Sequence, residues 1–323
     1  MKEKNIRPKK LFDKYTALSR MDAKKFFIKS NKKKITCPAC KKFGNFFLEK
    51  DNFKYDKCPK CLTIYVSPRH DSKIYQQYYS LSDSAKFWAT DFYKKTLKER
   101  IKRLWKPKAK HVQAIIKKEK KITNIIDIGA GYGLFLNEIK KNIKINTFAL
   151  EPSKLLGDIC KGNNHILLNY FLENLPKNEI PKGKNIYTCF ELFEHLHDPQ
   201  FFLKKLYNCM KKNEIVILTT LSGIGLDIDI LGKFSQSIQP PYHINFFNPD
   251  SIKILLEKNN FKIIDISTPG KLDMDILINN YDKIDNPFWK KFIKKSSTLE
   301  KNNMQKFIQK NNLSSHMSVI FRK

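Results

Sequence analysis

The chain has 323 residues, of which 41% are hydrophobic and 12% aromatic, with only 11 glycines and 14 prolines. These values exclude a collagen-like, low-complexity or wholly disordered chain, and the length predicts one main domain with attachments. A formal net charge of +31 ordinarily indicates a polyanion partner, but only six of the 62 basic residues are arginine, which favours compositional drift over nucleic-acid binding.

Residues 1–34 are predicted to form a basic extension. They hold 13 lysines and arginines and three acidic residues without sustained helical or strand periodicity, so we expect a mobile or loosely helical segment. They lack the apolar stretch of a secretory signal, and no apolar run of 18 residues occurs in the chain. We therefore predict a cytoplasmic protein without a membrane span.

Two cysteine pairs mark a small separate unit at residues 35–66. Each pair has the form C-x2-C, and 17 residues separate the pairs, which is the spacing of a four-thiolate zinc ribbon. Disulfides are the alternative, but a cytosolic chain keeps its thiols reduced. Four thiolates leave no open coordination position, so the sequence predicts a structural zinc ion held by Cys37, Cys40, Cys58 and Cys61.

Residues 67–121 have a helical, aromatic pattern. We interpret this linker as helices packed on the next domain, with a lid over a bound ligand as the alternative.

Short apolar runs alternate with helical stretches over residues 122–268, which is typical of an α/β domain with a parallel sheet covered on both faces. The predicted strands are 122–129, 146–151, 165–169, 185–190, 214–220 and 261–268, and the predicted helices lie near 132–142, 153–161, 199–211 and 250–260. Asp198-Pro199 and Asn248-Pro249 predict capped helix starts. Residues 269–323 are predicted to add helices and a last apolar run at 317–321.

A glycine-rich turn follows the first predicted strand. Gly129, Gly131 and Gly133 allow a sharp turn and close approach of a ligand to the backbone. Leu134 stands where the dinucleotide fingerprint requires its third glycine, which disfavours a nicotinamide cofactor. Glu151, at the end of the second strand, stands where an acid binds ribose hydroxyls, so the pattern favours an adenosine-type ligand.

Several motifs together resemble the class I S-adenosylmethionine-dependent methyltransferases. The first motif is GAGYG, which follows a predicted strand ending in Asp. The others are EPS, FELFEHLHDP and PPYHINFFNPDSI, and the resemblance spans roughly residues 120–268. CPAC, CPKC, KFW and LSSHM are similar to a subgroup with an N-terminal zinc-binding segment, associated with surface-polysaccharide and sugar biosynthesis. The resemblance implies a doubly wound, Rossmann-like seven-stranded sheet whose last strand is antiparallel.

The resemblance also implies a set of cofactor contacts. Asp127 and the backbone of Gly129, Ala130 and Gly131 would hold the methionine end of S-adenosylmethionine, and Glu151 the ribose diol. Phe190 and Glu191 would line the pocket. Glu173 stands in the stretch where many relatives carry an acid for the adenine amino group, with backbone contacts alone as the alternative.

Methyl transfer requires the methyl donor and the acceptor to be held in line. If the acceptor is a hydroxyl, a base must also remove its proton. We predict that His195 and His243 supply this base or contact the acceptor, with Glu194 beside them, because both histidines follow predicted strands at the carboxyl edge. Hydrogen bonds to local backbone are the alternative role for each.

Glu191, Glu194 and His195 are also similar to the divalent-ion ligands of ubiquinone-pathway O-methyltransferases, which implies Mg²⁺ or a transition ion there; pocket lining is the alternative. The predicted acceptor is a hydroxyl of a sugar, sugar nucleotide or glycan precursor, inferred from the resemblance. The two alternatives are an RNA methyltransferase, which binds more weakly as salt rises, and a non-catalytic scaffold.

Overall fold

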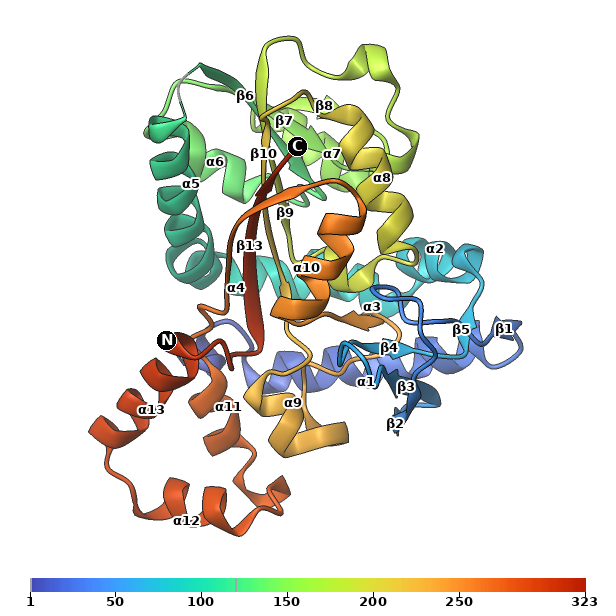
Figure 1. The fold of residues 1–323 in the computed structure, drawn as a ribbon, viewed down its shortest axis with the longest axis vertical. Coiled ribbons are helices and arrows are strands. Elements are labelled where there is room, and N and C mark those ends of the chain that lie inside the picture. The colour runs from blue at the N-terminus through green and yellow to red at the C-terminus, as the bar shows by residue number, and fades with distance from the viewer. Residues whose placement is uncertain (1, 120) are drawn as a thin grey trace.

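A seven-stranded sheet forms the centre of the molecule in the computed structural model, which describes residues 2–119 and 121–323 (Figure 1). Met1 of the predicted extension and Lys120 of the predicted linker lie outside the described residues. The strands run in the order β12-β13-β10-β9-β6-β7-β8. They are β6 (Ile122–Ile128), β7 (Asn146–Leu150), β8 (Ile166–Leu168), β9 (Lys184–Phe190), β10 (Ile215–Leu221), β12 (Lys262–Ser267) and β13 (His316–Arg322).

The predicted α/β fold is confirmed. Strand β13 pairs antiparallel with both β10 and β12, whereas the remaining neighbours in the sheet pair in parallel. The apolar run 317–321 is therefore the antiparallel strand that the sequence predicted. All seven residues of β10 are buried, as expected for a strand covered on both faces.

Helices cover both faces of this sheet. On one face α5 (Lys106–Lys118) and α6 (Leu134–Lys140) place Val112, Phe135 and Leu136 against apolar residues of β6, β9 and β10. Helices α8 (Pro199–Cys209) and α10 (Pro249–Lys258) pack on the other face, and α7 (Lys154–Gly162) adds Cys160 to the first. The predicted caps are confirmed: Asp198 accepts from the Phe201 amide and Asn248 from the Ser251 amide.

The cysteine unit forms a second, antiparallel sheet that includes a strand from the main domain. Its own strands are β2 (Asn45–Lys50), β3 (Phe53–Lys57) and β4 (Ile64–Val66), and β11 (Asn245–Phe246) pairs with β4 as the fourth strand. A two-stranded pair, β1 (Lys32–Lys33) with β5 (Arg69–His70), closes the unit.

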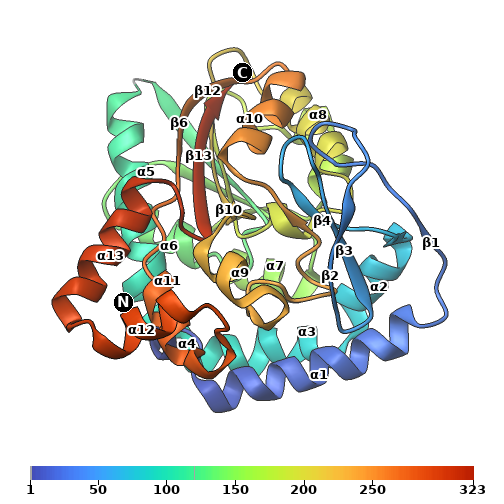
Figure 2. The same ribbon diagram turned by 60° about the horizontal axis from the view of Figure 1, so that its bottom comes forward.

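The basic N-terminal segment is helical, but it is better ordered than the mobile or loosely helical extension that we expected. It forms α1 (Lys9–Phe27), a 19-residue helix that runs beneath α3 and the cysteine unit (Figure 2). Phe12, Tyr15, Ala23 and Phe27 are buried at three- to eight-residue spacings, and lysines occupy the outer face. The apolar stripe is interrupted by polar Ser19 and Asp22, which is why simple periodicity missed it.

The predicted linker is helical, as its pattern indicated. It contains α2 (Ser72–Leu81), α3 (Asp83–Phe87) and α4 (Tyr93–Arg100). The π-helical turn Trp88–Phe92 joins α3 to α4, and the π-helical turn Ile101–Trp105 joins α4 to α5. Short 3-10 turns occur at Glu3–Asn5, Leu172–Asn174, Lys177–Glu179, Phe193–His195, Gly232–Phe234 and Tyr281–Lys283.

Four helices near the C-terminus build a small lobe with its own apolar core. They are α9 (Leu226–Leu231), α11 (Asp273–Asn279), α12 (Pro287–Lys295) and α13 (Thr298–Lys310). Among the described residues, no helix combines the length and apolar character needed to cross a bilayer.

Candidate functional site

The glycine-rich turn between β6 and α6 adopts a backbone that other residues rarely reach. Gly129, Gly131 and Gly133 have φ values of 74°, 55° and 66°. A Cβ atom at Gly133 would lie 2.9 Å from the His165 ring, so this position also lacks space for a side chain. The turn thus places backbone amides at the carboxyl edge of the sheet, where open α/β sheets bind ligands.

Glu151 lies against this turn, and its predicted contact with the ribose diol stays a prediction. Its carboxylate accepts hydrogen bonds from the amides of Gly131 and Ser153, both at 2.9 Å. Only 6% of the residue is exposed, and burial raises the pKa of the carboxyl group despite these two bonds. A carboxylate has about four acceptor positions, so about two remain for hydrogen-bond donors of a ligand.

Asp127 is the next-to-last residue of β6, beneath the turn. Burial raises the pKa of its carboxyl group to about 7, and the Thr188 hydroxyl donates to it over 2.7 Å. Ala130 packs at the edge of the core formed by α5 and α6. Glu173 lies half-buried on the 3-10 turn after β8, where burial raises its pKa; its contact with adenine stays a prediction.

Glu191 faces basic groups that the sequence analysis did not identify as its partners. Lys108 Nζ and His316 Nε2 lie 2.7 and 2.8 Å from its Oε1 atom, and the Thr219 hydroxyl donates to the same oxygen. Burial opposes ionisation, but the two basic groups outweigh it and hold the pKa of Glu191 well below its usual range. Its neighbour Phe190 packs edge-on against Phe135.

The expected ion site at Glu191, Glu194 and His195 is not supported, because Glu191 is engaged elsewhere. Among the described residues, the group that gathers near this point is instead Glu194, His195 and His243, whose ligand atoms all lie within 4.8 Å of one another. Their elements are the 3-10 turn after β9 and the loop before β11, two segments that lie far apart in the sequence.

The two histidines of this cluster have the same hydrogen-bond pattern. Nδ1 of His195 lies 2.9 Å from the Tyr242 carbonyl oxygen, and Nδ1 of His243 lies 2.7 Å from the Ser237 carbonyl oxygen. A carbonyl oxygen only accepts, so each Nδ1 carries hydrogen and each Nε2 keeps a lone pair. Burial lowers their pKa values to about 4 and about 3, so both rings are neutral at pH 7.

Glu194 completes the cluster as a nearly inaccessible acid. It is 2% exposed and accepts a hydrogen bond from the Thr220 hydroxyl over 2.7 Å. Burial, aided by the charge of Glu191, raises its pKa to about 8. Glu194 and His195 are adjacent in the sequence, whereas His243 could be predicted only to lie at the same edge of the sheet.

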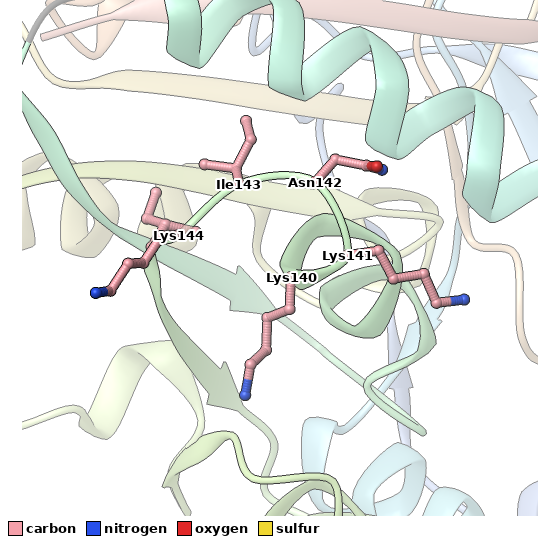
Figure 3. Close-up of a pocket in the computed structure, with 6 residues that line it drawn as sticks. Lys140, Lys141, Asn142, Ile143 and Lys144 are labelled. Carbon is pink, nitrogen blue, oxygen red and sulfur yellow. The ribbon is translucent and has the colours of Figure 1, made fainter.

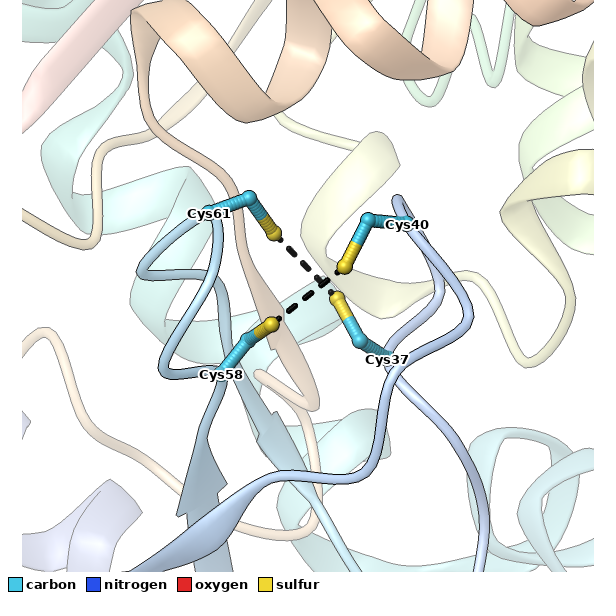
Figure 4. Close-up of side chains that lie close together, drawn as sticks. All are labelled: Cys37, Cys40, Cys58 and Cys61. Carbon is cyan, nitrogen blue, oxygen red and sulfur yellow. Dashed lines mark hydrogen bonds between the residues drawn. The ribbon is translucent and has the colours of Figure 1, made fainter.

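The four predicted zinc ligands converge, as Figure 4 shows. The Sγ atoms of Cys37 and Cys61 are 3.5 Å apart and those of Cys40 and Cys58 are 3.3 Å apart, which is far longer than a disulfide bond. The two turns match: the Lys41 amide donates to the Cys37 carbonyl, and the Leu62 amide to the Cys58 carbonyl. This arrangement fits a closed tetrahedral zinc site.

The cysteine unit also holds the loop that carries His243, which the sequence did not indicate. The Tyr55 hydroxyl of β3 donates to the His243 carbonyl oxygen over 2.8 Å. Arg69 of β5 donates to the Ile244 carbonyl and to the Asn245 side chain. Neither residue belongs to a recognisable motif, so only the folded structure reveals the connection.

A surface cavity of about 380 Å³ lies away from this site. Residues 140–145 line it, at the turn between α6 and β7 (Figure 3). This turn precedes β7 and is therefore at the amino edge of the parallel strands, opposite the glycine-rich turn. Lys140 donates to the Asn164 carbonyl and Lys141 pairs with Glu138, so these lysines serve local structure.

This chain is similar to known proteins over the main domain. A family model described as "Methyltransferase domain" matches residues 89–266. The mitochondrial ubiquinone biosynthesis O-methyltransferase of Schizosaccharomyces pombe is 27% identical over 104 residues, covering 30% of this chain and 38% of that protein. The Rickettsia bellii enzyme of the same description is 25% identical over 150 residues, covering 43% and 61%. The chain therefore spans less than two thirds of the length of these relatives.

This chain is also similar to solved structures. An S-adenosylmethionine-dependent methyltransferase from Archaeoglobus fulgidus has a TM-score of 0.48 at 18% identity, covering 72% of this chain and all of that one. The plantazolicin methyltransferase in complex with S-adenosylhomocysteine has a TM-score of 0.49 at 12% identity, covering 77% and 93%.

Proposed function

This chain belongs to the class I S-adenosylmethionine-dependent methyltransferases, and on that basis we propose that it methylates a hydroxyl oxygen of a small molecule. The observation that carries the proposal is the cluster of Glu194, His195 and His243 at the carboxyl edge of the sheet, the edge that also carries the glycine-rich turn. Relatives named as O-methyltransferases support an oxygen acceptor.

In this proposal the turn and the strand ends hold the cofactor. The amides of the glycine-rich turn and Asp127 face the methionine end, and Glu151 receives the ribose hydroxyls. Phe190 and Glu191 line the space beyond β9. The transfer is an in-line displacement at the methyl carbon, so holding the two reactants in line supplies much of the rate enhancement.

The two neutral imidazoles are suited to accept the acceptor's proton. Each presents an Nε2 lone pair while its Nδ1–H is fixed by a backbone carbonyl. We therefore propose that His195 or His243 is the general base, worth about 10²–10⁴-fold in rate. Replacing each singly with Asn tests this role. At least one variant should lose tenfold or more in turnover, while His111→Asn on the exposed face of α5 should leave it unchanged.

For the acceptor we propose a sugar, sugar nucleotide or glycan precursor. Tyr79 supports it: this half-exposed ring lies 6.2 Å from the His195 ring and 5.6 Å from Tyr242, and aromatic rings of this kind pack well against a sugar. Incubation with methyl-labelled cofactor and fractionated cell extract tests the proposal. Label in sugar compounds supports it, whereas label in RNA, with binding that weakens steeply as salt rises, supports the RNA methyltransferase instead.

A divalent ion at the same cluster is a second candidate role. One carboxylate and two imidazoles form a donor set that suits a transition ion better than Mg²⁺, and both imidazoles donate Nδ1–H to carbonyls as metal-bound histidines usually do. Coordinated Nε2 atoms could not act as a base, so the two roles exclude each other. Titration with Co²⁺ after the cysteine site is filled with zinc distinguishes them, because only the ion site gives new visible absorption bands that His243→Asn removes.

A further inference from the structure

A second cavity lies on the cysteine unit, over strands β2 and β3. It measures about 490 Å³, and its wall includes Lys34, Phe46, Lys54, Asp56 and Ser67. Strand β2 is the free edge of the four-stranded sheet and lies apart from the main sheet in Figure 1. No residue of the wall belongs to the glycine-rich turn, to the predicted zinc ligands or to the histidine cluster. A cavity of this volume can hold a small molecule.

Asp56 in this wall is a buried acid without a partner. It is 6% exposed, and within residues 2–119 and 121–323 its carboxylate has no cation at ion-pair distance and accepts no hydrogen bond. A buried carboxylate has lost hydration and needs hydrogen-bond donors in its place. Because Asp56 lines the cavity, a molecule bound there is placed to supply these donors.

Strand pairing places an aromatic ring on each side of Asp56. Phe46 of β2 and Tyr65 of β4 are its direct partners in the two antiparallel ladders, so the three side chains share one face of the sheet. Phe46 is 65% exposed and presents an open ring to the cavity. The buried Tyr65 hydroxyl has no hydrogen-bond partner of ordinary geometry in the described part of the chain. It lies directly behind the wall, because a Cβ atom at Gly44, another lining residue, would be 2.7 Å from it and 2.9 Å from the Asp56 Cβ atom.

Two lysines give the same cavity an excess of positive charge. Lys34 and Lys54 are exposed, and neither forms an ion pair among the residues that the structure describes. Against the single carboxylate of Asp56 they attract one anionic group. Neighbouring donors and acceptors suit hydroxyl groups, which donate to a carboxylate and accept from an ammonium group. The carboxylate repels a chain of phosphates, which makes a nucleic acid the less suitable occupant.

We propose that this face of the cysteine unit binds a sugar ring that carries a phosphate or carboxylate group. Hydroxyls of the ring donate to Asp56, and the carbon–hydrogen face of the ring packs on Phe46. The anionic group lies toward Lys34 and Lys54. The inference goes beyond the proposed function, because the sugar bound here need not be the molecule that is methylated.

Titrations of the full, zinc-loaded chain followed by ligand NMR test the proposal. The four ligands are glucose 1-phosphate, glucuronate, glucose and inorganic phosphate. At least one anionic sugar should bind about tenfold or more tightly than both glucose and phosphate, because it alone contacts the lysines and Asp56 together. The comparison of the two anionic sugars shows which anion the site prefers. If neither binds more tightly than glucose and phosphate, the proposal is overturned, and this result needs no variant.

Two variants locate the bound sugar. Asp56→Asn and Phe46→Ala should each weaken its binding about tenfold or more, and Phe46→Ala removes an exposed ring, so it serves even if Asp56→Asn does not fold. Asp51→Asn and Phe201→Ala are the matched controls. Asp51 pairs with Arg20 in the turn between β2 and β3, and Phe201 is an exposed ring on α8, so both should keep the wild-type affinity. Wild-type affinity in both Asp56→Asn and Phe46→Ala would overturn the proposal.

Other occupants and other sites give different results. Sugar binding that is lost in His243→Asn and kept in Phe46→Ala would place the sugar at the histidine cluster and overturn the proposal. A short single-stranded RNA that displaces the sugar, and itself binds more weakly to Phe46→Ala, would make a nucleic acid the occupant and also overturn it. Titration of the same samples with S-adenosylhomocysteine keeps the two conclusions apart, because a chain that binds the sugar but not this nucleoside would reject the proposed function alone.

Discussion

Carboxylates at the carboxyl edge of the sheet differ in charge although they lie close together. Glu191 is held ionised by Lys108 and His316, whereas burial raises the pKa values of Asp127, Glu151 and Glu194. A buried acid without a counter-ion lowers stability, and such groups are concentrated where a ligand supplies the missing charge. In the proposed function, the ammonium group of the cofactor would supply a positive charge, and its ribose hydroxyls would supply hydrogen bonds.

The variant Asp127→Asn tests whether this buried acid lowers the stability of the chain while it favours cofactor binding. The pKa of Asp127 is about 7 in the folded chain and 3.8 as its reference value, so the folded state retains a proton that the unfolded state has lost. Asp127 therefore lowers stability progressively from pH 4 to pH 7, and fully above pH 7. The variant keeps an acceptor for Thr188, so its free energy of unfolding at pH 8 should exceed the wild-type value by about 1–4 kcal/mol, and by little at pH 4.

The same variant should bind S-adenosylhomocysteine more weakly at pH 8, measured by calorimetry beside denaturant unfolding. Glu214→Gln is the control, because Glu214 is a buried acid with a raised pKa at the start of β10, at the opposite edge of the sheet. It should alter stability and leave the cofactor affinity unchanged. A variant Asp127→Asn with lower stability at pH 8 would contradict the argument.

At the scale of elements, the cysteine unit contacts the loop that carries His243 at the carboxyl edge of the sheet, so it does not stand apart from that edge. Strand β11 pairs with β4, and His243 lies two residues before β11. The Asn248 side chain donates to the Cys61 carbonyl, so the same loop is fixed again on its other side. The position of His243 therefore depends on the sheet that the four cysteines organise.

Tyr55→Phe should slow turnover through this connection. The change removes the hydroxyl that donates to the His243 carbonyl and leaves a part-buried acceptor without its partner. We expect a loss of about 1–2 kcal/mol in stability and a fall in kcat with an unchanged affinity for S-adenosylhomocysteine. Tyr187→Phe is the control: it removes a buried hydroxyl that donates to the Cys209 carbonyl, so stability should fall while kcat does not. Equal kcat values for the two variants would show that Tyr55 has only a structural role.

The sequence predicted elements whose signals are local. Apolar runs located every strand of the main sheet, and the Pro-containing caps located α8 and α10. It could not predict the partners of Glu191, because its φ of 53° turns the side chain out of strand register toward Lys108 and His316, which are remote in the chain. The pairing of β4 with β11 was equally hidden, since a two-residue strand has no periodicity.

At the scale of the whole molecule, three attachments meet at the same edge of the sheet. The Glu3 amide donates to Asp275 of α11, so the N-terminal segment reaches the C-terminal lobe. Asp227 and Asp273 both accept from the Ser315 hydroxyl, next to His316. Helix α1 and the cysteine unit share one aromatic core with Tyr242. Because these contacts connect the attachments to one another, we expect the chain to unfold as one cooperative unit.

Zinc removal tests that cooperativity. Because the cysteine unit shares a sheet with β11 and a core with α1, losing the metal should lower the melting temperature of the entire chain by at least about 5 °C, in a single transition. Cys40→Ser should have the same effect and reduce the zinc content below one equivalent, measured by mass spectrometry. Cys209→Ser replaces a buried thiol outside the cluster and should keep the zinc. An early transition confined to the cysteine unit, with the main domain melting unchanged, would show that the unit folds independently and that His243 is held without it.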